Sequence, residues 1–182
     1  MAVAGAIYDP SSPFVPSYNH VQPARPYDGE IEELIRTAMT DKDPELSARV
    51  SVHSFYGHVY FVGDPGPTFA LFAENTAHYV KATHYVSGHW FPEGTADKDS
   101  DQRLKNAVAY TLRDINSRPE NHVVVEVCGG NVIVMGVVTT PQAVAEGEKL
   151  ARLPGVKSVR SYLMTSDQAL KPIGNASDLY HK

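Results

Sequence analysis

The chain has 182 residues, of which 42% are hydrophobic and 20% are charged, and its net charge is −5. This length is enough for one ordinary domain or two small ones, and the acidic balance argues against a nucleic-acid-binding protein. The single cysteine, Cys128, excludes an internal disulfide and a multi-cysteine zinc site, and no apolar run approaches the roughly 18 residues of a membrane span.

Residues 1–27 form a Pro-rich N-terminal arm. The proline density forbids a helix and favours an extended lead-in to the first domain. Aromatic residues alternate with the prolines, and they either dock on the following domain or bind a partner. Docking is favoured because aromatic rings are usually buried. The prolines are Pro10, Pro13, Pro16, Pro23 and Pro26, and the aromatic residues are Tyr8, Phe14, Tyr18 and Tyr27.

The first domain is expected over residues 28–92. Its first helix should begin at Asp28 as the N-cap, bury a stripe that includes Ile31 and Ile35, and stop at Asp43-Pro44. Two strands follow over 49–54 and 58–63, with a turn at Tyr56-Gly57. A helix over about 68–81 and a strand over 84–91 complete the domain.

A polar linker, residues 93–100, leads to a second domain over residues 101–166. A helix over 101–115 precedes a hairpin from Val123 to Gly136, in which Gly129-Gly130 supplies the positive φ angles of a tight turn. Thr140-Pro141 begins a helix that runs to 153, and a closing strand contains Val156, Val159 and Leu163. Cys128, at the hairpin end, is interpreted as a small apolar strand residue. Residues 167–182 are an unrepeated C-terminal tail.

The two domains are related by an ungapped internal repeat with an offset of 73 residues. Such a set of matches indicates a duplication. In the hairpin, the offset takes Val50, Val52, Gly57, Val59, Phe61 and Gly63 to Val123, Val125, Gly130, Val132, Val134 and Gly136. Elsewhere it takes Asp28 to Asp101, Ile31 to Leu104, Ile35 to Val108, Met39 to Leu112, Ala70 to Ala143, Val80 to Leu153 and Val86 to Val159.

Each unit therefore has the order α-β-β-α-β. Three strands and two helices of this kind predict an α+β fold. We expect two tandem sandwiches, each a three-stranded mixed sheet with two helices on one face.

This order resembles the BON domain, a small module of bacterial envelope proteins. The second unit carries the motif of the family at Val123, Val125, Gly130, Val132, Val134, Gly136, Ala143, Gly155 and Val156. The first unit matches the hairpin, but Ala82-Thr83 stands where the family has Gly-Val, which weakens its helix-to-strand turn. Two such units after an arm with Tyr8-Asp9 resemble the dual-BON outer-membrane lipoproteins and the osmotically induced periplasmic proteins.

The resemblance implies a non-enzymatic protein that binds phospholipid membranes and supports envelope integrity. It also implies a periplasmic location, with an anchor to the outer membrane in a full-length precursor. The expected partners are anionic phospholipid and, as a second class, an envelope protein, with no nucleic acid.

Lipid binding is expected on the first helix of the second unit. The chain carries a charge of −6 through Glu93 and +1 after it, so the second unit is the one suited to an anionic surface. The alternative is an ordinary solvated helix face. An exposed tyrosine between cations fits the headgroup region, and related dual-BON lipoproteins use this helix. The candidate lipid-binding residues are Arg103, Asn106, Tyr110 and Arg113, with Lys105 at the flank.

Two other functions are alternatives to lipid binding. The first is a protein-interaction module that uses the N-terminal arm or the acidic first unit. The second is a metal site built from the histidines of the first unit, such as His84 and His89, but their spacing matches no recognised metal motif. No nucleophile motif is present either. We therefore expect no enzyme activity, no catalytic residues, no metal site and no cofactor.

Overall fold

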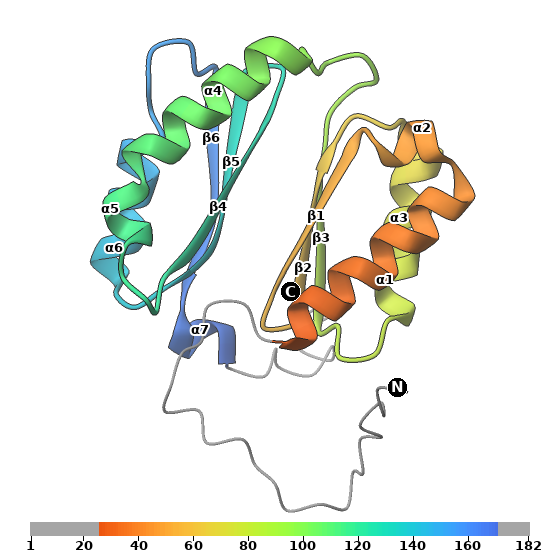
Figure 1. Ribbon diagram of the computed structural model, residues 1–182, viewed down its shortest axis with the longest axis horizontal. Helices are drawn as coiled ribbons and strands as arrows, with labels where there is room; N and C mark the ends of the chain where they lie inside the picture. Colours follow the sequence, from red (N-terminus) through yellow and green to blue (C-terminus); the bar gives the residue numbers. More distant parts are fainter. Residues whose placement is uncertain (1–25, 171–182) are drawn as a thin grey trace, which may run out of the picture.

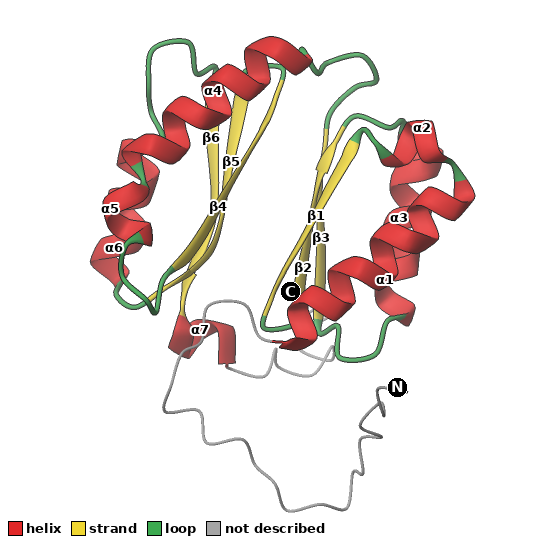
Figure 2. Cartoon of the chain, viewed as in Figure 1, coloured by secondary structure: helices red, strands yellow, loops and turns green. Residues whose placement is uncertain are grey.

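The computed structural model describes residues 26–170, which fold into four layers (Figures 1 and 2). Two helix layers lie on the outside, and two three-stranded sheets face each other between them. Nearly all of the predicted Pro-rich arm, and the predicted tail beyond residue 170, lie outside the described residues.

The first unit follows the predicted order, with boundaries within two residues of those expected. The exception is an additional short helix, α2, where the first helix was expected simply to stop. Asp43 caps it through hydrogen bonds that its carboxylate accepts from the backbone N–H groups of Glu45 and Leu46. The elements are α1 (Pro26–Lys42), α2 (Pro44–Ser47), β1 (Val50–Phe55), β2 (His58–Gly63), α3 (Pro67–Tyr79) and β3 (Tyr85–Trp90).

The second unit repeats this order, with four differences from the prediction. The helix expected to run to 153 ends at Leu150, and Val156, expected in the closing strand, precedes β6. The expected helix over 101–115 begins three residues earlier and is interrupted at Leu112. A short helix, α7, occupies the start of the predicted tail. The elements are α4 (Lys98–Thr111), α5 (Arg113–Asn116), β4 (His122–Cys128), β5 (Asn131–Val138), α6 (Pro141–Leu150), β6 (Ser158–Thr165) and α7 (Ser166–Leu170).

The two sheets have the same topology and the same register. In each, the hairpin strands are antiparallel and the third strand lies parallel to the second. Val50 pairs with Gly63, and Val123 pairs with Gly136 at positions 73 residues later. The predicted fold class is therefore confirmed: two repeated α+β units, each a three-stranded mixed sheet with helices.

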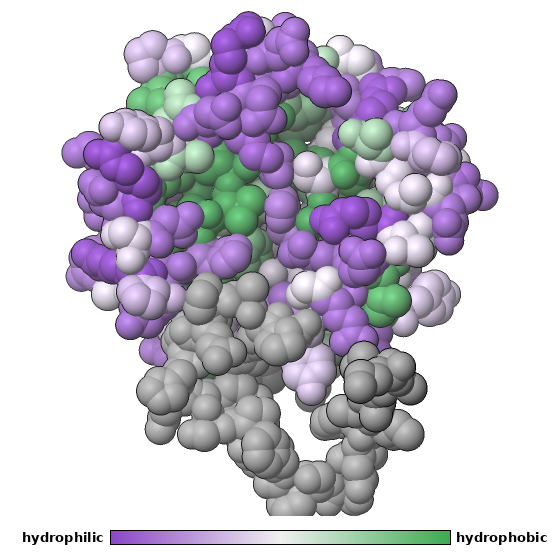
Figure 3. Space-filling model, viewed as in Figure 1, coloured by the Kyte–Doolittle hydropathy of each residue, from purple (hydrophilic) through white to green (hydrophobic). Residues whose placement is uncertain are grey.

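Each sheet buries apolar side chains on both of its faces. The outer faces pack on the helices, around Phe61 in the first unit and Val134 in the second. The inner faces pack on each other, and hydrophobic residues are visible between the helix layers in Figure 3. Cys128 lies buried in this shared layer, where burial raises the pKa of its thiol to about 12. The buried residues of the shared layer are Phe55, Tyr60, Val62, Cys128, Ile133, Met135, Val137 and Ala169.

Asp28 has a different role from the predicted N-cap, because α1 begins two residues before it. Its carboxylate is buried and accepts hydrogen bonds from the Ser54 hydroxyl and from the N–H groups of Tyr56 and Gly57, at 2.7–2.9 Å. An aspartate in the first turn of the helix therefore holds the hairpin turn of its own unit. The second unit repeats this arrangement with Asp101.

The helix-to-strand turn of the first unit keeps the backbone conformation of the second despite the missing glycine. Ala82 has a φ of 73°, and Gly155, its repeat counterpart, has a φ of 92°. An L-residue in the left-handed region costs about 1 kcal/mol. We expect Ala82→Gly to raise the free energy of unfolding by roughly 0.5–1 kcal/mol, as measured by urea unfolding. Gly155→Ala is the matched reverse change and should lower the free energy of unfolding. A lower free energy of unfolding for Ala82→Gly would contradict a left-handed conformation at Ala82.

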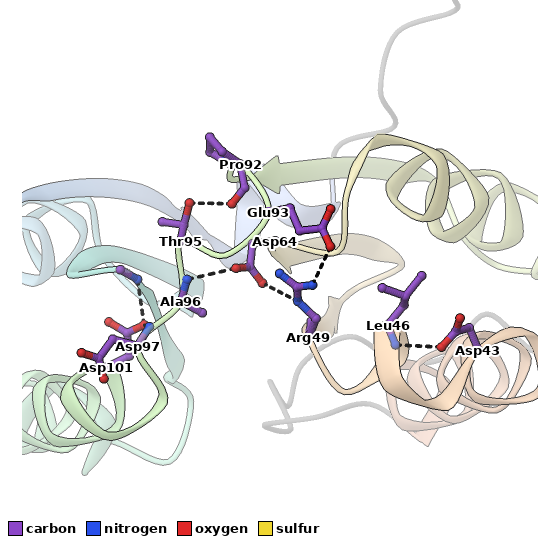
Figure 4. A network of polar contacts seen from close by, with 11 residues as sticks. Asp43, Leu46, Arg49, Asp64, Pro92, Glu93, Thr95, Ala96, Asp97 and Asp101 are labelled. Atoms are coloured by element: carbon purple, nitrogen blue, oxygen red, sulfur yellow. Dashed lines mark hydrogen bonds and ion pairs between the residues drawn. The ribbon is translucent and has the colours of Figure 1, made fainter.

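The segment between the units is tied to the first unit through Asp64 (Figure 4). This carboxylate is 1% exposed and accepts hydrogen bonds from Arg49 Nε at 3.2 Å and from the Ala96 N–H at 3.0 Å. Arg49 also bonds Glu93 at 3.1 Å. Burial opposes ionisation of Asp64, but these hydrogen bonds outweigh it and lower the pKa of the carboxyl. The predicted linker is therefore held against the first unit.

Candidate functional site

The candidate lipid-binding helix is fixed on the sheet by its apolar face. Val108 and Leu112 are almost completely buried in the core of the second unit. The Thr111 hydroxyl hydrogen-bonds the carbonyl of Leu150, which ties α4 to the end of α6. Asp97 caps the helix by accepting a hydrogen bond from the Ser100 N–H. The opposite face of α4 is consequently held toward solvent.

Four of the five predicted residues share that solvent face. Arg103, Asn106, Tyr110 and Arg113 are all exposed, and the Tyr110 side chain is 68% exposed. Arg113 belongs to α5, yet its guanidinium carbon lies 4.0 Å from the centroid of the Tyr110 ring. This cation–π contact keeps an aromatic ring and a cation together at the surface. The structure thus brings Tyr110 and Arg113 into direct contact.

Local polar contacts occupy part of this surface. Arg103 donates to the Ser100 hydroxyl at 3.2 Å, and Asn106 accepts from Gln102 at 2.9 Å. Arg113 lies 3.3 Å from the carboxylate of Asp114, but both side chains are exposed. An exposed pair of this kind is weak, typically below about 1 kcal/mol, so it does not prevent Arg113 from meeting another anion.

Lys105, the fifth predicted residue, points elsewhere. Its amine donates to Glu126 Oε2 at 2.9 Å, on the sheet, and is separated from the exposed face of α4. Glu126 is buried and also lies 2.8 Å from His53 of the first unit. Burial raises the pKa of Glu126, but hydrogen bonds from His53 and Lys105 outweigh that effect and lower it. Lys105 therefore neutralises a carboxylate between the units.

The Glu126 contact was missed in the sequence, although a signal for it exists. Glu126 is the one charged residue in the valine run of β4, and strand alternation turns it away from the face of Val125 and Val127. A single charged residue on the strand face that is turned away from the helices needs a partner if it is buried. It therefore indicates another layer of structure packed on that face.

The corresponding face of α1 in the first unit is acidic. Glu30, Glu33 and Thr37 are exposed at positions equivalent to Arg103, Asn106 and Tyr110. Arg36, on the same helix, lies within 3.8–3.9 Å of the carboxylates of Glu32 and Glu33. The two outer helix faces point away from each other (Figure 1), so the basic surface and the acidic surface lie on opposite sides of the molecule.

The histidines of the described residues do not gather into a metal site. Within residues 26–170, no group of three or more His, Cys, Asp or Glu side chains is arranged to hold a metal ion. His89, one of the two histidines considered for a metal, has its Nδ1 3.3 Å from the Tyr162 hydroxyl. His84, the other, lies next to His58, whose pKa is lowered mainly by burial and secondarily by His84.

The second unit carries a recognisable sequence signature. Residues 96–165 match the family model of the BON domain. This match covers the second unit from the end of the linker to the end of β6, and it includes the exposed face of α4. BON domains are known from envelope proteins and from phospholipid binding, which fits the surface described above in general terms.

Two solved structures are similar to the chain at low identity. One is CdsD, a structural protein of the Type III secretion system of Chlamydia trachomatis, with 13% identity over 85% of this chain and 68% of that chain and a TM-score of 0.30. The other is the C-terminal domain of CdsD, with 16% identity over 75% of this chain and 67% of that chain and a TM-score of 0.29.

Proposed function

We propose that this chain is a non-enzymatic envelope protein that binds anionic phospholipid membranes through the exposed face of α4 and α5. Both units would be BON domains in tandem, located in the periplasm, and the protein would support envelope integrity. The observation that carries the proposal is the exposed Tyr110 ring, in contact with Arg113 and on the same face as Arg103.

The physical basis of the proposal is the match between this face and a headgroup layer. A tyrosine ring suits the interfacial depth, and each cation contributes on the order of 1 kcal/mol near an anionic leaflet. Asp101, which a helical projection places near this face, is buried and holds the hairpin turn, so its charge is kept from the lipid. None of the helices within residues 26–170 has the length and apolar character to cross a bilayer, and the proposal requires surface binding alone.

The test is co-sedimentation with phosphatidylglycerol-containing vesicles and with neutral vesicles, at low and high salt. We expect binding that requires the anionic lipid and weakens with salt. Replacing Arg103, Tyr110 and Arg113 with alanine removes two cations and an interfacial ring. The affinity should fall by about thirtyfold, which corresponds to about 2 kcal/mol from the two cations.

The matched control is the triple variant Arg36→Ala, Lys42→Ala and Tyr79→Ala. It removes the same number of cations and one exposed tyrosine, all from the first unit. It should bind vesicles as the natural chain does. An equal loss of vesicle affinity in both variants, or no vesicle binding by the natural chain, would refute lipid binding by this surface.

A second candidate function is protein interaction through the acidic first unit. A pocket of about 340 Å³ lies between the start of α3 and the end of β3, with Leu71, Trp90 and Phe91 in its lining. The carboxylates of Glu74 and Glu93 border it, and Glu74 accepts a hydrogen bond from the Trp90 indole. An apolar pocket with acidic borders suits a basic-hydrophobic segment of an envelope partner. Vesicle-independent capture of one defined partner, lost on Leu71→Asp, would favour this function.

A further inference from the structure

A second basic site lies on the second unit, away from the exposed face of α4. It is a pocket of about 310 Å³ where the C-terminal end of α6 meets β6. β6 is an edge strand of its sheet, so this pocket opens at the side of the sandwich. Its lining is mostly polar and comprises Glu148, Arg152, Val159, Arg160, Ser161 and Tyr162.

The two arginines of this pocket have no carboxylate partner among residues 26–170. Both are exposed, and every ion pair within the described part of the chain involves other cations. Glu148 lies in the last turn of α6 and Arg152 follows two residues after the end of the helix, and no ion pair within 4.0 Å joins them. Two guanidinium groups thus line one cavity without a carboxylate within ion-pairing distance.

The effect of Arg160 on its surroundings supports this description. The pKa of His89, which faces the pocket strand from the opposite sheet, is lowered by burial and further by the charge of Arg160. Arg160 also lies over the Tyr162 ring, at 5.8 Å from its centroid, which positions the side chain along the edge of the sandwich.

A neutral donor completes the pocket. Ser161 Oγ accepts a hydrogen bond from the Leu163 N–H at 3.3 Å, and this leaves its hydroxyl hydrogen free to donate to a ligand. Guanidinium groups match the oxygens of a phosphate with two parallel N–H donors each. The Ser161 hydroxyl lines the same pocket and can act as a third donor to an oxyanion.

We propose that this pocket binds a phosphate group, held by Arg152, Arg160 and the Ser161 hydroxyl. Glu148 opposes the charge of the ligand and therefore favours a singly charged phosphodiester over a doubly charged phosphate monoester. The phosphate can belong to a phospholipid headgroup or to a small soluble phosphate ester. The site does not depend on lipid binding by α4, so either proposal can fail alone.

The test is a titration of the ¹⁵N-labelled chain with inorganic phosphate, followed by NMR and compared with sodium chloride at equal ionic strength. We expect saturable shifts of the amides of Arg160, Ser161 and Tyr162 with phosphate and not with chloride. In the variant Arg152→Gln with Arg160→Gln, the affinity should fall at least about tenfold. Glu148→Gln should raise the affinity, because it removes a like charge from the pocket.

A control variant removes the same charge elsewhere on the molecule. Arg36→Gln with Lys42→Gln replaces two exposed cations of the first unit and should leave the phosphate affinity unchanged. Equal shifts with chloride, or an unchanged affinity in the pocket variant with a native spectrum, would overturn the proposal. If the Gln variant does not fold, Arg152→Lys with Arg160→Lys keeps the charge but removes the paired donors, and its affinity should still fall severalfold.

Two further ligands identify the source of the phosphate. Dihexanoyl phosphatidylglycerol below its micelle concentration represents a lipid headgroup, and glycerol 3-phosphate represents a soluble ester. Shifts at the same amides with both support a site for phosphate groups that includes lipid. Shifts with glycerol 3-phosphate alone support a soluble ligand and contradict the preference for a phosphodiester. Shifts with neither ligand, at concentrations that saturate with inorganic phosphate, would overturn the assignment of the site to phosphate esters.

Discussion

Replacing Asp101 with alanine is expected to lower the free energy of unfolding by about 3 kcal/mol. Its buried carboxylate accepts hydrogen bonds from the N–H groups of Asp97, Gly129 and Gly130 at 2.7–2.9 Å. Each buried donor that loses its partner costs about 1 kcal/mol or more. Urea unfolding at neutral pH, followed by circular dichroism, measures the loss.

Asp99→Ala is the matched control for this change. Asp99 also lies in the first turn of α4, but it is exposed, so its removal should change the free energy of unfolding by less than about 0.5 kcal/mol. Asp28→Ala should reproduce the large effect in the first unit, because Asp28 holds the equivalent turn. A loss below 1 kcal/mol for Asp101→Ala would show that the hairpin turn does not need this carboxylate.

Acidification is expected to destabilise the packing of the two sheets. His58, His89 and His122 belong to strands of the two sheets, and for each of them burial is the main cause of a lowered pKa. A histidine whose pKa is lower in the folded state binds more protons when unfolded, so stability increases with pH. The contribution of these histidines to the free energy of unfolding is fully present above their unfolded pKa of 6.5. It declines as the pH falls below 6.5, toward the lowered pKa of the folded state.

The measurement is the free energy of unfolding from urea titrations at intervals between pH 7.5 and 5.5. We expect a decrease below about pH 6.5, and a smaller decrease in a variant with all three histidines replaced by glutamine. Glu126 does not contribute to this window, because its carboxyl has a lowered pKa and loses its contribution only as the pH falls below about 4.5. A stability that is flat over the whole range would contradict burial of these imidazoles.

Most of the fold could be predicted from the sequence because it depends on local patterns. Strand alternation, the Gly-Gly turn and the 73-residue offset together specify two similar units and their hairpin register. The packing of one sheet on the other was not predicted, although β5 carries the signal. Its continuous apolar run, which includes Ile133, Val134 and Met135, is typical of a strand buried on both faces.

The errors in the prediction have specific physical causes. Asp28 is a favourable N-cap residue by type, but its carboxylate makes tertiary hydrogen bonds that no local pattern reveals. The helix break at Leu112 contains neither proline nor glycine. The Arg152 and Arg160 pocket joins the end of a helix to a strand edge, and residues that meet in this way have no fixed spacing in the sequence.

The exposed face of α4 was the most predictable part of the candidate site. Residues three and four apart share a helix face, so Arg103, Asn106 and Tyr110 follow from helical periodicity alone. The direction of the Lys105 side chain could not be predicted in this way, because it depends on the buried charge of Glu126. Glu126 lies on a strand 21 positions away from Lys105, and helical spacing carries no information about it.

Two polar contacts between the sheets pair equivalent positions of the two repeats. His53 meets Glu126 and His89 meets Tyr162, each pair being separated by the repeat offset of 73 residues. A residue touches its own counterpart only near a two-fold axis, so the units are arranged as the subunits of an isologous dimer would be. In a dimer of identical chains each of these positions would face itself, and a glutamate would oppose a glutamate. Joining the two copies in one chain removes that constraint: a histidine can complement the glutamate on the axis, and the two outer surfaces can differ in charge.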